Sequence, residues 1–187
     1  REVLAPIEAE LERLGAPAIL RGQDFTNARG AIARFDRMAV EIRLIDAQEC
    51  ARADLAVAGA VAALTRGLVE ERWSSSAAQR ALPSAVLVEQ LALASDAGPD
   101  APVTDRRLAA LLGCQGATDL GQLCRRAVEA CYAGPPELES ALETVFAQGP
   151  LATRLLAALG ADFDRADLER VWGRLADCLE RGEVFLP

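Results

Sequence analysis

The stretch that decides the fold runs from Ile32 to Cys50 and reads IARFDRMAVEIRLIDAQEC. From Val40 to Ile45 the side chains alternate between two faces, which is typical of a strand. The preceding run, Ile32 to Asp36, is rich enough in apolar and aromatic residues to pair with it across a short turn. The sequence therefore predicts an antiparallel hairpin over residues 31–46, with its turn near Arg37 and Met38.

Alternation places Glu41 and Arg43 on the same face of the second strand. Register decides whether Arg34 and Asp36 join them, and a slip of one residue reverses the answer. No Asn-Gly or Asp-Gly pair specifies the turn, so the sequence leaves the register open. A carboxylate can bind a divalent ion, and a guanidinium can grip a carboxylate or phosphate bidentately. An ordinary ion pair on a solvated sheet face is the alternative.

Composition favours a helical protein. The chain has 187 residues, 51% of them apolar, which is enough for one sizeable core or two small ones. Aromatic residues make up only 4%, so alanine, leucine and valine must fill the core, and the first two are strong helix formers. We expect an α+β fold, predominantly α, with a small antiparallel sheet packed on a helical bundle. Residues 1–97 would form one part and the helical region 103–187 the other.

Several function classes are disfavoured. The formal charge of -8 and the dispersed arginines argue against a dedicated nucleic-acid binder. The absence of histidine excludes Ser-His-Asp and Cys-His nucleophiles and imidazole metal sites within this chain. The five cysteines form no C-x-x-C pair, so we expect reduced thiols and a cytoplasmic protein. The uncharged run from Leu55 to Thr65 is too short to span a bilayer, and we expect it to be a helix buried in the centre of the domain.

The remaining elements follow from local signals. Ala16 to Leu20 is predicted as a short strand. In the helical run after Pro83, the buried side is expected to carry Val86, Leu87 and Leu91, with Gln90 as a further candidate. The last helix should begin at Asp164 as N-cap and stop at Gly182, with the tail packing back on the domain. Because the sequence starts at Arg1 within a helical pattern, two readings stay open: the C-terminal part of a longer chain, or a complete chain whose start is missing.

The polar loop 21–30, followed by Ile32–Asp36 and Val40–Cys50, resembles the C-terminal half of the bacterial carboxylate-amine ligases related to glutamate–cysteine ligase type 2. The shared pattern is a valine, Glu-x-Arg, a nearby Asp-x-Gln and a long apolar helix. Members of that group resemble glutamine synthetase in the catalytic sheet. The likeness covers residues 20–73, and beyond them it rests on helical order.

The resemblance implies an ATP-dependent ligase that phosphorylates a glutamate-like carboxylate and lets an amine displace the phosphate. It implies that Glu41 binds Mg²⁺ and that Arg43 holds the substrate carboxylate or the acyl phosphate. Arg34 would neutralise the phosphates of ATP, with Arg29 also near the nucleotide. Positioning and charge neutralisation are what phosphoryl transfer needs, and arginines and carboxylates supply both.

Alternatives remain at the sequence level. A ligase would need further metal-binding carboxylates, and because no second acidic cluster is visible we expect this chain alone neither to turn over ATP nor to bind it tightly. A helical interaction or regulatory module would instead show a convex surface with Glu41 paired to Arg34 or Arg43, whereas a ligase would show a concavity and unpaired sheet edges. Such an edge could pair with a second copy and form a homodimer. A phosphagen-kinase-like relative fits the Asp-x-Gln segment poorly.

Overall fold

The structure is a computed structural model that describes residues 4–20 and 30–187. The chain divides into two compact units, on either side of the bond between Ala47 and Gln48. Helices dominate the described residues, which also contain a small two-stranded antiparallel sheet. The predicted fold class, α+β and predominantly α, is therefore confirmed. The expected organisation, with the helical region 103–187 packed on residues 1–97, stays a prediction.

The first unit holds the hairpin. Its elements are α1 (Leu4–Arg13), η1 (Ala18–Leu20), β1 (Ala31–Arg34), η3 (Phe35–Arg37) and β2 (Ala39–Ile42). The strand expected at Ala16–Leu20 is wrong, because these residues enter a 3₁₀ turn instead. Pro17 precedes this turn, and its carbonyl oxygen accepts a hydrogen bond from the Leu20 amide at 2.9 Å. A proline with a local hydrogen bond of this kind favours a turn over an extended strand.

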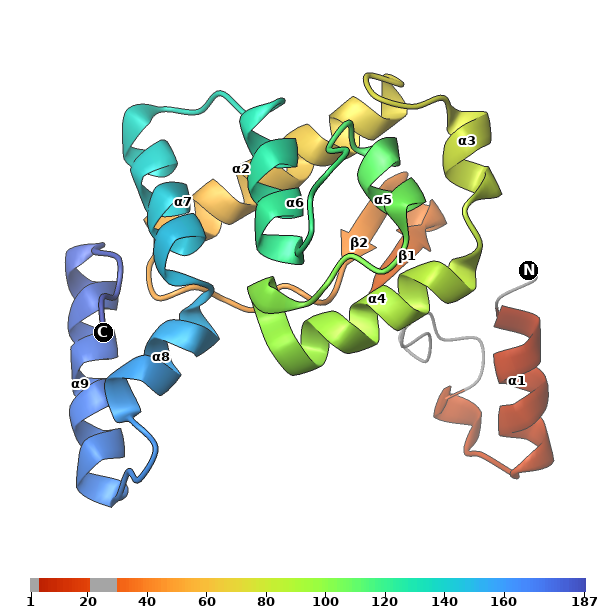
Figure 1. The fold of residues 1–187 in the computed structure, drawn as a ribbon. Coiled ribbons are helices and arrows are strands. Elements are labelled where there is room, and N and C mark those ends of the chain that lie inside the picture. The colour runs from red at the N-terminus through yellow and green to blue at the C-terminus, as the bar shows by residue number, and fades with distance from the viewer. Residues whose placement is uncertain (1–3, 21–29) are drawn as a thin grey trace. The chain divides into compact units, whose positions relative to one another are not determined.

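The hairpin confirms the predicted pairing and supplies the register that the sequence left open (Figure 1). Ile32 lies opposite Glu41, and Arg34 lies opposite Ala39. The chain reverses through η3 and Met38, whose backbone is left-handed at φ 50°. Because directly opposite residues share a face, this register places Arg34 on the same face as Glu41. The second strand ends at Ile42, earlier than the alternation predicts.

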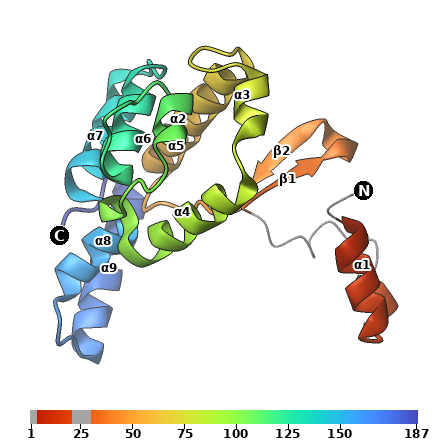
Figure 2. The ribbon, with the colours of Figure 1, turned by 45° about the vertical axis from the view of Figure 1, so that its right-hand side comes forward.

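The second unit is helical. Its long helix α2 contacts α6 and α7, whereas α8 and α9 lie side by side at one end (Figures 1 and 2). The elements are α2 (Ala51–Val69), α3 (Ser76–Ala81), α4 (Ser84–Ala97), η4 (Gly98–Asp100), α5 (Arg106–Leu111), α6 (Leu120–Glu129), α7 (Pro136–Gln148), α8 (Leu151–Leu159) and α9 (Arg165–Arg181).

Two clusters of small and aliphatic side chains form the core of this unit. The first joins α2, α6 and α7 through Ala56, Ala60, Val128, Ala141 and Leu142. The second surrounds α5 and α6 with Ala109, Cys114, Leu123 and Ala127. Alanines at the contact let the helix axes approach closely, since interaxial distance depends on the side chains between them. The alanine-rich core expected from composition is confirmed.

The expectation that α2 is buried on all sides is wrong. One face is buried through Ala53, Ala56, Ala60 and Gly67, but Leu55 and Val69 on the outer side are mostly exposed. In α4 the expected burial of Gln90 is confirmed, but the expected burial of Leu87 and Leu91 is wrong, because both are about half exposed. A helix face without charged residues can be buried at little cost, but it is buried only if another element packs against it. Among the described residues, no element covers the outer faces of α2 and α4.

The end of the chain follows the predicted signals. Asp164 caps α9 and forms a reciprocal capping box with Asp167, and Gly182 ends the helix in a left-handed conformation. The tail returns to the unit, where Phe185 is completely buried. Among the described helices, none combines the length and the hydropathy that crossing a membrane requires.

Candidate functional site

Three charged side chains meet on one face of the hairpin. Arg34 donates from Nη1 to Glu41 Oε2 at 2.6 Å, and Arg43 donates from Nε to Glu41 Oε1 at 2.8 Å. Each oxygen of the carboxylate therefore accepts from a different guanidinium. These three residues are the site candidates predicted from the sequence, and the structure brings them together in one cluster, the Arg34–Glu41–Arg43 cluster.

Strand geometry explains this convergence. Arg34 follows Ile32 by two residues and Arg43 follows Glu41 by two, so all four side chains leave the same face of the pleat. The relative exposures are 21% for Arg34, 23% for Arg43 and 37% for Glu41, so the arginines are the better shielded members. Charges in this partly shielded position interact more strongly than they would in open solvent.

The arginines control the charge state of the carboxyl group. The Arg34 guanidinium, and then that of Arg43, hold the pKa of Glu41 below its usual range. Glu41, and then Asp36, raise the pKa of Arg34. The cluster therefore joins two guanidinium groups around one carboxylate, and Asp36 is a second acidic partner of Arg34 at 3.4 Å. Guanidinium forks of this kind suit a phosphate or carboxylate ligand.

The proposed metal role of Glu41 stays a prediction. Both of its oxygens already accept from arginines, so a cation bound there would have to displace at least one guanidinium. Within residues 4–20 and 30–187, no group of three or more acidic or cysteine side chains is arranged to hold a metal. A magnesium ion prefers six oxygen ligands, including waters, and would need partners besides Glu41. Arg29, expected near the nucleotide, lies outside the described residues.

The surroundings of the cluster match both sequence readings in part. Glu41 is paired with both arginines, as a structural module predicts. The sheet has two strands in the described part of the chain, so each strand has an outer edge without a strand partner there, as a ligase fragment predicts. The opposite face carries Val40 and Ile42, which are largely exposed. An open edge beside an exposed apolar face is a surface on which further strands could add.

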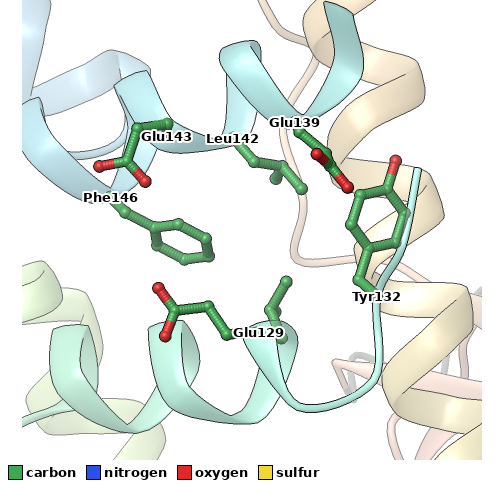
Figure 3. Close-up of a pocket in the computed structure, with 7 residues that line it drawn as sticks. Glu129, Tyr132, Glu139, Leu142, Glu143 and Phe146 are labelled. Atoms are coloured by element: carbon green, nitrogen blue, oxygen red, sulfur yellow. The ribbon is translucent and has the colours of Figure 1, made fainter. Parts of the chain in front are cut away.

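A second candidate is a pocket of about 220 Å³ between α6 and α7 (Figure 3). Figure 3 shows Phe146 between the carboxylates of Glu129 and Glu143, with Tyr132 beside Glu139 at the other end. Val128 and Leu142 complete the lining and are buried.

The acidic groups of this pocket determine which ligands it can take. Arg125 donates to Glu129 at 2.9 Å and to Glu143 at 2.5 Å, and its guanidinium lies 5.7 Å from the Phe146 ring centroid. Glu139 accepts from the Gly134 amide at 3.2 Å. Three carboxylates against one guanidinium repel phosphates, so this pocket does not suit a nucleotide. The Arg34–Glu41–Arg43 cluster is the better anion site.

Sequence reasoning did not identify this pocket. Glu139, Glu143 and Phe146 are spaced by four and then three residues, so they share a face of α7. That spacing is visible in the sequence. Which residues of α6 face them depends on how α6 and α7 pack, and the spacing within α7 does not predict this packing.

Comparisons with known proteins do not show a family for this chain. An uncharacterised protein of Archaeoglobus fulgidus is 28% identical over 186 residues, which are 100% of this chain and 44% of the relative. The chain thus spans less than half the length of the relative it matches. No protein-family model and no solved structure matches the sequence.

Proposed function

We propose that this chain is part of an ATP-dependent carboxylate-amine ligase, and that its hairpin binds anionic groups of the reaction. The observation that supports the proposal is the convergence of Arg34 and Arg43 on one face around Glu41. The resemblance of residues 20–73 to the ligases related to glutamate–cysteine ligase gives the reaction class. A match to 44% of a longer relative agrees with a site that is completed by other residues.

The proposed chemistry has two steps. A carboxylate oxygen of the acid substrate attacks the γ-phosphorus of ATP, forming an acyl phosphate and releasing ADP. The amine nitrogen then attacks the acyl carbon, inorganic phosphate leaves as the C–O bond breaks, and the nitrogen loses a proton to the departing phosphate or to solvent, which gives the amide. Both steps place negative charge on oxygens, and arginines stabilise that charge without exchanging protons, because guanidinium stays protonated in proteins. Arg34 would face the ATP phosphates, and Arg43 the carboxylate or acyl phosphate.

The described residues fit the phosphates better than they fit the metal. Bound Mg²⁺ would neutralise phosphate charge during the transfer. Glu41 is the residue that would hold it, together with oxygen ligands from outside the described residues. The ion pairs of Glu41 with Arg34 and Arg43 also give Glu41 a structural role, because they hold the two guanidinium groups on one face of the hairpin. A glutamate-like acid, an amine and a cytoplasmic location belong to the same proposal.

The test is release of ADP that depends on an amine, measured on the natural protein at its full length. Magnesium, glutamate and a panel of amino acids would be supplied to the wild type and to Glu41→Gln and Arg34→Met variants. Removing one such charge-stabilising group should lower kcat/KM by about 100-fold or more. Glu89→Gln, on the exposed surface of α4, is the matched control and should keep wild-type activity.

The second candidate is a non-catalytic helical module in which the hairpin is only structural. The pairing of Glu41 with both arginines favours it, because such a site is satisfied without a ligand. Under this reading no amine would promote ADP release, or release would be indifferent to Glu41→Gln. Either result would contradict the ligase proposal.

A further inference from the structure

Helix α9 carries two neighbouring stripes of side chains, and one of them is open. The first stripe packs inward, with Val171 buried and Arg174 and Cys178 half-buried. On this side Arg174 donates to the Leu186 carbonyl oxygen at 2.5 Å and lies 4.8 Å from the ring centroid of Phe185. The helix α8 also packs against α9. The contacts of Arg174 with the tail occupy this side of α9.

The second stripe lies one residue further along, about 100° round the helix. It consists of Leu168, Trp172, Leu175 and Leu179, and we name it the α9 seam. The spacing of four, three and four residues is that of helices that pair along their length. Leu168 and Leu175 are half-buried, but Trp172 is 56% exposed and Leu179 is 65% exposed. Large apolar side chains in a row at this exposure mark an interaction surface.

We propose that the α9 seam binds the same seam of a second copy, antiparallel and across a twofold axis. In that arrangement Leu168 packs against the partner's Leu179, and Trp172 packs against the partner's Leu175. The same two contacts repeat on the other side of the axis. All four seam side chains of each copy are then buried against the partner's seam, and no further element is needed to cover them. A surface that complements itself in this way is what a twofold dimer requires.

The charges at the ends of α9 select the antiparallel direction. Arg165 stands at the first turn, is 92% exposed and pairs with the exposed Glu169 of its own helix at 2.8 Å, and Glu183 lies just beyond the last turn and is also exposed. In a parallel pair Arg165 would face its own copy, and so would Glu183. In the antiparallel pair Arg165 reaches the partner's Glu183 and the negative end of the partner's helix dipole. At both ends of the antiparallel dimer, a positive side chain then lies beside a negative side chain of the partner.

The face of α9 opposite the seam does not share these properties. Asp177 is exposed there, and a Cβ built on the exposed Gly173 meets no atom within 4 Å. This face is therefore polar and open, and it provides a matched control position. The proposal is independent of the ligase function, because α9 contains none of the residues of the Arg34–Glu41–Arg43 cluster.

Sedimentation velocity of the natural full-length protein, with and without substitutions in α9, tests the proposal. The wild type should be a dimer at micromolar concentration. Trp172→Glu with Leu179→Glu should raise the dimer dissociation constant by about 100-fold or more, since two of the four apolar seam side chains are lost from each protomer. Asp177→Lys should remain a dimer. Far-UV circular dichroism would check that each variant keeps its helices.

A charge exchange tests the direction and does not alter the apolar seam. Arg165→Glu should weaken the dimer, and adding Glu183→Arg should restore it. A monomeric wild type overturns the proposal, and protection of Trp172 from a soluble quencher in that monomer would show that another part of the chain covers the seam. A dimer that resists the double glutamate variant, or an Arg165→Glu defect that Glu183→Arg does not relieve, overturns it as well.

Discussion

Arg154 and Glu49 are separated by 105 positions in the sequence, yet they form a completely buried ion pair with an Nη1–Oε1 distance of 2.5 Å. Both side chains have a relative exposure of 0%. Three further groups satisfy them: Arg154 also donates to the carbonyl oxygens of Phe185 and Gly149, and Glu49 accepts from the Phe185 amide. One arginine thereby joins the start of the helical unit, the first turn of α8 and the C-terminal tail.

The first prediction is that Glu49→Gln destabilises the helical unit. The substitution leaves the Arg154 charge buried without its counter-charge, and breaking a buried pair from one side costs about 3–5 kcal/mol. Urea unfolding followed by circular dichroism measures the loss. Glu129→Gln is the control, because Glu129 pairs with Arg125 on an exposed surface and such pairs contribute little. Equal effects of the two substitutions would contradict the role assigned to the buried pair.

The second prediction concerns pH. Burial raises the pKa of Glu49, but bonds from Arg154 and the Phe185 amide outweigh it, and the pKa lies below its ordinary value. A carboxyl group whose pKa is lowered by folding contributes stability above its unfolded pKa of about 4.3, and this contribution is lost as pH falls through the folded value. Unfolding free energies between pH 7 and pH 3 should therefore fall less steeply for Glu49→Gln than for the wild type. Parallel curves for the two proteins would exclude this linkage.

The third prediction compares two helical glycines. A Cβ at Gly67 in α2 would lie 2.5 Å from two ring atoms of Trp73, whereas a Cβ at Gly173 in α9 meets nothing within 4 Å. Gly67→Ala should destabilise by about 1–3 kcal/mol through overpacking, because Gly113 confines the same ring on another side. Gly173→Ala should stabilise by about 0.5–1 kcal/mol through helix propensity. Thermal unfolding distinguishes the two signs, and a stabilising Gly67→Ala would show that Trp73 can move aside.

The fourth prediction separates anion binding from catalysis in the hairpin. In Glu41→Gln the carboxylate no longer competes for the guanidinium groups of Arg34 and Arg43. Pyrophosphate, supplied without magnesium, should bind the variant roughly three- to tenfold more tightly than the wild type. Calorimetric titration measures this, and Glu41→Gln combined with Arg34→Met should bind weakly. A variant with unchanged or weaker pyrophosphate binding would argue against the hairpin as an anion site.

Residue spacing predicted much of the local structure. The alternation around Glu41 predicted the second strand, and the turn near Arg37 and Met38 is where the chain reverses. Asp164 and Gly182 predicted both ends of α9. These signals are local, because a cap or a turn depends on residues within a few positions of one another.

The candidate site was only half determined by spacing. Alternation put Glu41 and Arg43 together, but Arg34 could have faced either way until the strand register was known. The register depends on which residues of two strands pair, and no turn residue in this sequence specifies that choice.

The sequence by itself determined the fold class, the hairpin and both ends of α9, because composition and short-range spacing carry that information. Only the tertiary structure decided that Glu49 meets Arg154, that α2 is open on one side, and that Trp172 faces outward beside a buried Val171. The physical reason is that burial is a property of pairs of surfaces. The spacing of apolar residues in the sequence shows which face of a helix is apolar. The element that covers this face comes from a distant part of the chain or from another molecule, so local spacing does not reveal it.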